Sequence, residues 1–260
     1  MKKNSYLGPI LIAHRGESYD APENTMAAIN LAWLQNADAV EIDIRLTKDN
    51  EIVVIHDSNT KRTSGISSVV KSQSLEELKK LDVGSYKKEK FINERIPTLR
   101  EVLKIIPPEK FIFIEIKCGI EIFDALRDVL ETSALNNTQI KLIGFDVTLM
   151  SSLKKSLLVY DVCWCKRINR EKIILAQRGW DKVIADAKKN NFNGLNLSYS
   201  RCLNKKVVDK IKSNNLKLYV WTVNNPREAD RLISYGVDGI MSDRTGWLRN
   251  KINFSGNFDE

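Results

Sequence analysis

The sequence predicts an α/β protein that folds as a closed (β/α)8, or TIM, barrel, and three observations support this. Apolar runs of strand length alternate with helical segments, which is typical of parallel strands joined by helices. The chain has 260 residues, and such barrels need roughly 250. No run approaches the roughly 18 apolar residues of a membrane-spanning helix. We therefore predict one domain over residues 1–260, with a barrel favoured over an open sheet.

The predicted elements follow one another in regular order. The expected strands are residues 9–13, 39–46, 51–55, 111–116, 140–145, 159–164, 194–197, 217–222 and 238–241. The expected helices are residues 24–35, 120–132, 149–155, 182–190, 205–214 and 226–235. Between the second and third strands, residues 47–50 predict a hairpin turn. The first dozen residues imitate a short signal peptide, but Pro9 interrupts the apolar run, which we expect to be the first strand.

One stretch breaks this alternation. Residues 57–98 are polar and rich in serine and lysine, with a short amphipathic piece at residues 75–81. We predict a small insertion over one end of the barrel. It could serve as a lid or as a surface addition, and the sequence leaves both open.

The composition favours small anionic ligands over nucleic acid. The net charge is +8, but 33 acidic residues are dispersed among 41 basic ones, without a long basic block or an aromatic-interleaved stripe. The four cysteines show no C-x-x-C spacing, so we expect reduced thiols. We predict a cytoplasmic protein without a nucleic-acid partner and without stable membrane association. The oligomeric state stays open.

The two histidines form the first candidate site. His14 ends the first predicted strand and His56 follows the strand at residues 51–55, and the next residues are Arg15 and Asp57. Residues at the carboxyl ends of barrel strands point into the active-site mouth. We therefore predict that the histidines occupy two equivalent strand ends and act as a pair. A lone histidine is more often structural, but here both histidines of the chain follow the same pattern.

The second predicted strand carries two acids on one face. Glu41 and Asp43 alternate with Val40, Ile42 and Ile44, and alternate side chains of a strand share a face. The outer face of a barrel strand is covered by helices, which suits the apolar residues, so the acids should point inward. Two buried carboxylates repel each other and need a compensating cation.

The fourth predicted strand repeats the pattern with Glu115 and Lys117. Three carboxylates from two strands offer only oxygen donors, which suit Ca²⁺ or Mg²⁺ better than Zn²⁺. Such a cation could bind a phosphodiester, while Lys117 and Arg15 neutralise the remaining charge. No G-x-S-x-G, glycine-rich phosphate loop or dinucleotide fingerprint occurs.

With these residues in place, the chain resembles the glycerophosphodiester phosphodiesterase family. The resemblance spans about residues 10–248, essentially the whole chain. The matching elements occur in the family's order: His14-Arg15-Gly16, Ala21-Pro22-Glu23-Asn24-Thr25, Glu41-Ile42-Asp43, His56-Asp57, Arg62-Thr63, Pro97-Thr98-Leu99, Glu115-Ile116-Lys117, Trp221-Thr222-Val223-Asn224 and Gly236-Val237-Asp238-Gly239-Ile240. Departures occur at Thr60, where the family usually has leucine, and at residues 241–244, Met-Ser-Asp-Arg.

The resemblance implies a (β/α)8 barrel and metal-dependent hydrolysis of glycerophosphodiesters to glycerol 3-phosphate and an alcohol. It implies one divalent cation, Ca²⁺ or Mg²⁺, and assigns the site residues by group. The metal ligands would be Glu41, Asp43 and Glu115. The catalytic acid and base would be His14 and His56. The substrate contacts would be Arg15 and Lys117 at the phosphate and Trp221 at the glycerol.

Several points stay open. Asn24 would orient the first helical loop, with an N-cap as its simplest role. The sequence does not divide acid and base between the histidines, and does not separate attack by water from a cyclic intermediate. The head-group preference also stays open. The competing functions are a phospholipase D-like activity on lysophospholipids, a non-catalytic phosphoester-binding module and a nuclease.

Overall fold

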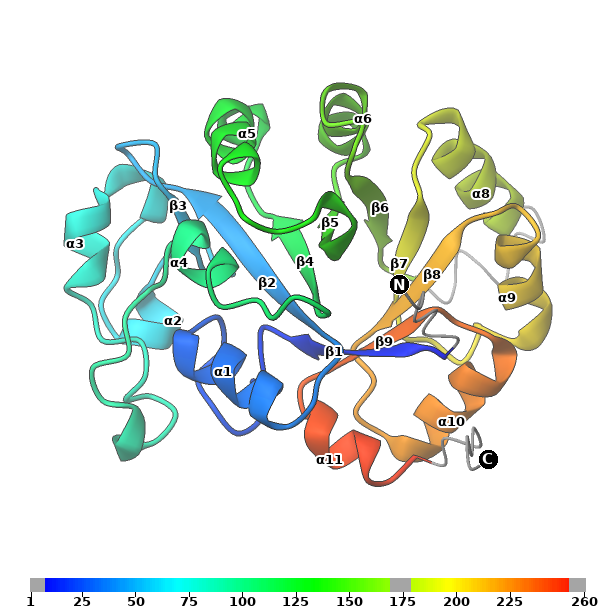
Figure 1. Cartoon of the computed structure of the whole chain (residues 1–260), viewed down its shortest axis with the longest axis horizontal. Helices are drawn as coiled ribbons and strands as arrows, with labels where there is room; N and C mark the ends of the chain where they lie inside the picture. Colours follow the sequence, from blue (N-terminus) through cyan, green and yellow to red (C-terminus); the bar gives the residue numbers. More distant parts are fainter. Residues whose placement is uncertain (1–7, 169–178, 253–260) are drawn as a thin grey trace.

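Eight parallel strands close into a barrel, which confirms the predicted fold class (Figure 1). The structure is a computed structural model that describes residues 8–168 and 179–252. The last strand pairs with the first, and the first pairs with the second, so the ring has no open edge. The barrel strands are β1 (Ile10–His14), β2 (Ala39–Leu46), β4 (Phe111–Ile116), β5 (Ile140–Gly144), β6 (Asp161–Lys166), β7 (Gly194–Ser198), β8 (Lys217–Trp221) and β9 (Gly239–Ser242).

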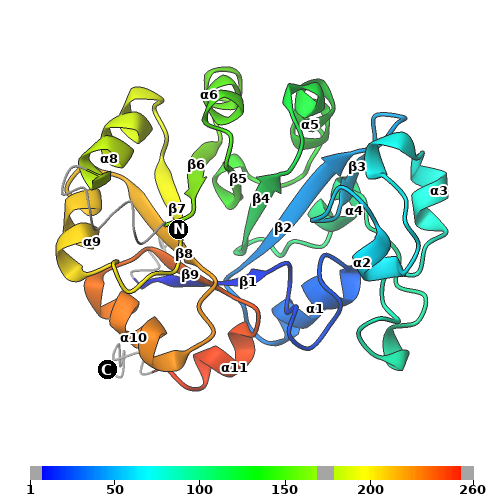
Figure 2. The same cartoon turned by 180° about the vertical axis from the view of Figure 1, so that it is seen from behind.

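Helices surround the strands, as Figures 1 and 2 show from opposite sides. They are α1 (Met26–Leu34), α4 (Leu99–Leu103), α5 (Phe123–Glu131), α6 (Val147–Ser156), α8 (Gly179–Lys189), α9 (Lys205–Lys212), α10 (Pro226–Tyr235) and α11 (Thr245–Arg249). Side-chain caps fix several starts: Asp146 accepts hydrogen bonds from the N–H groups of Thr148 and Leu149, and α6 therefore begins earlier than its apolar pattern suggested. The sequence did not predict α4 and α11, since five residues are too few for a helical periodicity to show.

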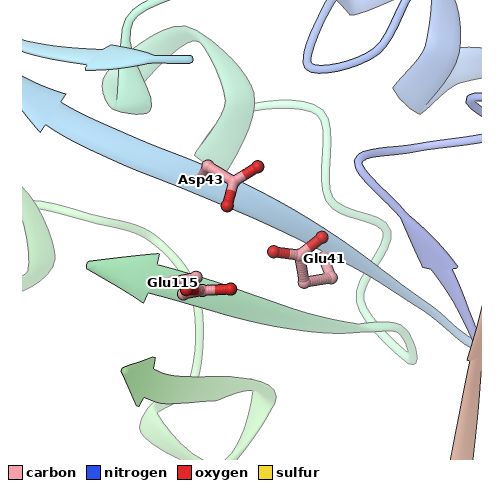
Figure 3. A group of neighbouring side chains, drawn as sticks. All are labelled: Glu41, Asp43 and Glu115. Carbon is pink, nitrogen blue, oxygen red and sulfur yellow. The ribbon is translucent and has the colours of Figure 1, made fainter. Parts of the chain in front are cut away.

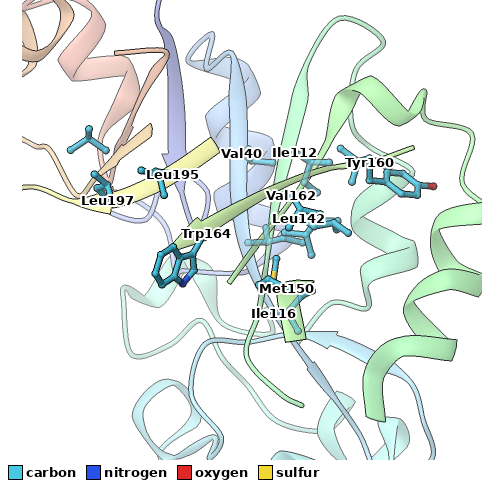
Figure 4. Close-up of a cluster of buried hydrophobic side chains, with 14 of the residues drawn as sticks. Val40, Ile112, Ile116, Leu142, Met150, Tyr160, Val162, Trp164, Leu195 and Leu197 are labelled. Atoms are coloured by element: carbon cyan, nitrogen blue, oxygen red, sulfur yellow. The ribbon is translucent and has the colours of Figure 1, made fainter. Parts of the chain in front are cut away.

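Most barrel strands divide their apolar side chains between two clusters. Val40, Ile42 and Ile44 point outward and join the larger cluster between strands and helices, part of which appears in Figure 4. The smaller cluster fills the barrel and consists of Ile12, Ala39, Phe113, Ile143, Cys163, Cys165, Tyr219 and Met241. The alternation expected on β2 is therefore correct, and it leaves Glu41 and Asp43 on the inner face. All four cysteines are free thiols.

One additional strand corrects a prediction. Strand β3 (Ile52–Val54) pairs antiparallel with β2 through Ile44↔Val54, after the predicted hairpin turn, and it is not a barrel strand. The expectation that His14 and His56 occupy two equivalent strand ends is therefore wrong. The chain instead doubles back, and the N–H of Ile55 donates to the carbonyl of Asp43 at 2.9 Å. This return brings His56 level with the acids of β2.

The predicted insertion lies beside β3 (Figure 2). It contains α2 (Lys61–Ser64), the short 3₁₀ helices η1 (Val70–Ser72) and η2 (Glu89–Phe91), and α3 (Leu75–Lys79). Its apolar side chains pack on β3 and form a third cluster: Val53, Ile55, Val70, Leu78, Val83 and Ile96. Among the described residues, no helix is long and apolar enough to cross a membrane. The single domain over residues 1–260 stays a prediction.

Candidate active site

Three carboxylates meet on the inner face of the barrel (Figure 3). Glu41 and Asp43 come from β2 and Glu115 from β4, where Asp43 and Glu115 are paired in register. One oxygen of each lies within 4.8 Å of the others. All three side chains are buried, so their charges are poorly solvated.

Burial and mutual repulsion perturb these acids in different directions. Burial, followed by the charge of Asp43, raises the pKa of Glu41 to about 8. The same two causes raise the pKa of Glu115. Burial also acts to raise the pKa of Asp43, but Arg15 and Lys117 outweigh it and the pKa is lowered. The group therefore holds more negative charge than its own surroundings can stabilise.

The donor atoms fit a hard divalent cation. Glu41 Oε1 is buried and has no hydrogen-bond partner among the described residues, and the inward oxygens Asp43 Oδ1 and Glu115 Oε1 are paired with the Lys117 ammonium. Buried carboxylate oxygens normally have such partners, and clustered oxygen donors are the ligands that Ca²⁺ and Mg²⁺ prefer. The three acids predicted as metal ligands therefore form one site able to hold a divalent cation.

Two basic side chains flank the carboxylates. Lys117 Nζ lies 2.5 Å from Glu115 Oε1 and 3.3 Å from Asp43 Oδ1. Arg15 Nε lies 3.2 Å from Asp43 Oδ2. The side chains of Lys117 and Arg15 are mostly buried, but 15% and 20% of their surfaces stay exposed. An anion that enters the mouth can therefore reach both cations.

The loop after β1 places Arg15 by its backbone. Its N–H donates to Glu41 Oε2 at 2.9 Å, and Arg15 has a φ of 60°. Gly16 follows with a φ of 75°, and a Cβ there would lie 2.6 Å from the carbonyl carbon of Ala28. Gly16 is therefore required both by its backbone angle and by the close approach of α1.

The carboxylate of Asp243, which directly follows β9, orients His14. Its Nδ1 lies 2.7 Å from Asp243 Oδ1, and Asn224 donates from Nδ2 to Asp243 Oδ2 at 2.7 Å. Burial raises the pKa of Asp243, but the hydrogen bond and charge of His14 outweigh it and lower the pKa. An ionised Asp243 can only accept, so Nδ1 carries the proton and Nε2 is the free nitrogen.

His56 has a similar partner in Asp57. Its Nδ1 lies 2.6 Å from Asp57 Oδ1, and Arg62 donates from Nε to Asp57 Oδ2 at 2.6 Å. Burial acts to raise the pKa of Asp57, but the hydrogen bonds from Arg62 and His56 lower it to about 2. Arg62 also binds Glu23 through both terminal nitrogens, at 2.6 and 2.9 Å, and Glu23 Oε1 accepts from Arg15 Nη1 at 2.8 Å. This chain of ion pairs joins His56 to Arg15.

The two histidines differ in charge preference. Burial lowers the pKa of His14, but the hydrogen bond with Asp243 and the charge of Glu41 outweigh it and the pKa is raised. For His56, burial dominates and lowers the pKa. His14 therefore keeps its second proton to a higher pH than His56 does.

The predicted substrate contact Trp221 lies in an aromatic group at the end of β8. Its ring packs edge to face on Phe145 at 5.7 Å, and the Arg167 guanidinium lies 5.5 Å from the Trp221 ring centre. Lys117 Nζ lies 5.6 Å from the centre of the Phe145 ring. Phe145 therefore joins the Trp221 ring to Lys117, one of the charged side chains of the site.

Comparisons with known proteins show the family in which this chain belongs. The sequence profile of the glycerophosphoryl diester phosphodiesterase family matches residues 14–247. The chain belongs to that family. A glycerophosphodiester phosphodiesterase of Caldanaerobacter subterraneus subsp. tengcongensis is 37% identical over 249 residues, covering 95% of this chain and 99% of the relative.

Solved structures agree with this assignment. A phosphodiesterase of Oleispira antarctica in complex with the product sn-glycerol-3-phosphate is 28% identical, with a TM-score of 0.84, over 94% of this chain and 96% of that one. The glycerophosphodiester phosphodiesterase of Thermotoga maritima is 26% identical, with a TM-score of 0.75, over 93% and 97%. The chain is thus an enzyme of the glycerophosphodiester phosphodiesterase class, and the family resemblance stated from its motifs is confirmed.

Sequence reasoning missed several residues of this glycerophosphodiester phosphodiesterase. Asp243 directly follows a barrel strand, which is the same signal that singles out His14, but the motif comparison places it only within a departure from the family pattern. Glu23 and Arg62 stood in quoted motifs without a role. Arg45 donates to the carbonyls of His56 and Lys117, at 2.9 and 2.7 Å, and joins the chain after β3 to the chain after β4.

Asn24 corrects one further expectation for the family motif. The N-cap of α1 is Thr25, whose side chain accepts from the N–H of Ala28. Asn24 has a φ of 57°, donates to Asp43 Oδ2 at 2.9 Å and accepts from the N–H of Asp43 at 3.1 Å. It therefore orients a metal-ligand candidate rather than capping the helix, because its left-handed backbone turns the amide toward β2.

Proposed function

We propose that this enzyme hydrolyses small glycerophosphodiesters to glycerol 3-phosphate and an alcohol, with His14 and His56 as general acid and base. The observation that carries the proposal is the matched setting of the histidines. Each Nδ1 is held by an ionised carboxylate, Asp243 or Asp57, at 2.7 or 2.6 Å. Each ring therefore keeps Nε2 for proton transfer, beside the same acidic group.

The pKa directions support a division of roles. His14, whose pKa is raised, would donate a proton to the leaving alkoxide oxygen. His56, whose pKa is lowered, would accept a proton from the attacking hydroxyl. Arg15 and Lys117 would hold the phosphate, since both carry charges at the edge of the carboxylate group. Trp221 would pack against the glycerol.

Glu41, Asp43 and Glu115 would hold one divalent cation, Ca²⁺ or Mg²⁺. When bound, it would offset the charge that develops on the non-bridging phosphate oxygens. Its positive charge would also stabilise the three carboxylates, which explains why they stand together in the barrel. Asn24 would keep Asp43 in position through their two hydrogen bonds.

The direct test measures release of glycerol 3-phosphate from a panel of glycerophosphodiesters. Protein stripped with EDTA should be inactive and should recover with Ca²⁺ or Mg²⁺ in a saturable manner. His14→Ala and His56→Ala should each lose at least about 100-fold in kcat. Near-wild-type turnover by either variant would remove that histidine from the mechanism.

Two further measurements separate the alternatives. Comparing glycerophosphocholine with lysophosphatidylcholine distinguishes the proposed hydrolysis from a phospholipase D-like activity on lipids. A plasmid-cleavage assay with an EDTA control distinguishes the proposed hydrolysis from a nuclease activity. Turnover of any diester rules out a non-catalytic binding module. Phosphorus NMR during turnover shows whether a cyclic phosphate forms before glycerol 3-phosphate.

A further inference from the structure

A polar cleft opens beside His56 and Asp57. Its volume is ≈ 780 Å³. It is lined by Arg45, His56, Asp57, Ser58, Asn59, Lys61, Arg62 and Ser67. The segment that follows β3 supplies most of this wall, and the lining contains no phenylalanine, tyrosine or tryptophan.

A second cleft continues the first. Its volume is ≈ 350 Å³, and it shares Arg45 and Ser58 with the first cleft. It adds Lys48 and Lys71 together with a single acid, Glu121. We call the two together the basic cleft. Its cationic side chains are Arg45, Lys48, Lys61, Arg62 and Lys71, against the carboxylates Asp57 and Glu121.

Much of this positive charge is uncompensated. Arg62 is paired with Asp57 and Glu23, but Arg45 uses its donors on two backbone carbonyls. Lys48, Lys61 and Lys71 have no carboxylate within ion-pair distance among residues 8–168 and 179–252. An anionic group that enters the basic cleft would therefore meet three lysines, Lys48, Lys61 and Lys71, that no carboxylate of the described residues holds in an ion pair.

We propose that the basic cleft receives the leaving head group and favours head groups that carry an additional phosphate or carboxylate. This inference rests on the proposed function, because the cleft begins at His56. A quaternary ammonium group is normally held by aromatic faces, and the cleft has none. Choline is therefore the poorest fit among common head groups.

The position of Trp221 separates the two arms of the diester. Trp221 ends β8, and β9 and β1 lie between β8 and β2 around the barrel. Trp221 and the basic cleft thus belong to strands that are not neighbours in the barrel. A diester whose glycerol packs on Trp221 would extend its second arm past His56 and into the basic cleft.

The test compares three substrates of the cation-loaded enzyme at low ionic strength: glycerophosphoinositol 4-phosphate, glycerophosphoinositol and glycerophosphocholine. We expect kcat/KM to be highest for the first, by about 10-fold over the choline diester, and this advantage should shrink as salt is added. Lys61→Glu should reduce the advantage by about 3- to 10-fold. The matched control is Lys206→Glu, an exposed position on α9 outside the cleft, which should leave it unchanged.

Two results would overturn the inference while leaving the proposed function standing. One is equal kcat/KM for all three substrates. The other is an advantage that Lys61→Glu and Lys206→Glu alter to the same extent, which would show a general effect of net charge. Failure to cleave any of the three substrates would instead overturn the proposed function, and the inference with it.

Discussion

His14 Nδ1 lies 2.7 Å from Asp243 Oδ1, although 229 positions separate the two residues in the sequence. Closure of the barrel creates this contact. Strands β1 and β9 are paired with Ala13 opposite Ser242, so the next residue of each strand stands side by side. The tautomer of His14 therefore depends on the final pairing of the sheet.

The contact predicts that Asp243→Asn impairs catalysis more than folding. We expect kcat to fall by about 100-fold or more, since an amide no longer enforces the Nδ1-protonated tautomer. The pKa of His14 should also decrease, because a hydrogen bond and a charge that raise it are both lost. Nitrogen-15 NMR of the histidine rings checks both effects. An unchanged His14 pKa in a folded variant would contradict the assignment.

Glu23 should act on both Arg15 and His56, because it joins the two through Arg62. Glu23→Gln removes the charge between two arginines, so Arg15 and Arg62 lose their shared anchor. We expect kcat/KM to fall by about 10- to 100-fold, with KM rising and kcat falling together. Glu109→Gln, at an exposed loop position, is the matched control. A loss in thermal stability without a kinetic change would show a purely structural role.

The raised pKa of Glu41 predicts that cation-free protein becomes less stable as pH rises. The folded-state pKa, about 8, lies above the ordinary value of 4.5, so the contribution is present below pH 4.5 and is lost as pH rises toward 8. Melting temperatures measured in EDTA should fall over this range, and added Ca²⁺ or Mg²⁺ should oppose the fall most at high pH. Glu41→Gln should flatten the slope; an unchanged slope would contradict the prediction.

The opposite pKa shifts of the histidines predict a bell-shaped dependence of kcat/KM on pH. Activity should decline as pH falls through the lowered pKa of His56, because its base form is lost. It should decline again as pH rises through the raised pKa of His14, because its acid form is lost. Initial rates at saturating cation across pH 5 to 9 check this. A profile with only one limb would contradict the assignment of both roles.

Gly16 should be less replaceable than Gly65, although both have a φ of 75°. Gly16→Ala adds a Cβ 2.6 Å from the backbone of Ala28, whereas a Cβ at Gly65 has nothing within 4 Å. We expect Gly65→Ala to cost about 1 kcal/mol from the backbone angle alone, and Gly16→Ala clearly more. Denaturant unfolding measures both. Equal losses would show that the contact with α1 relaxes freely.

The sequence by itself determined the order of the strands and of the longer helices, and the inward face of Glu41 and Asp43. It also determined the family, which the profile match confirmed. These features depend on periodicities of two to four residues and on local motifs, which a linear pattern records directly. The cytoplasmic location and the absence of a nucleic-acid partner stay predictions.

Only the tertiary structure decided which distant groups meet. It paired His14 with Asp243 through barrel closure, and it brought His56 to Asp43 by an antiparallel strand rather than a second barrel strand. It also linked Arg15 to His56 through Glu23 and Arg62. The physical reason is distance: two groups form a hydrogen bond, or change each other's pKa strongly, only when they lie within a few ångströms. The separation of two residues far apart in the chain is fixed only when the sheet closes.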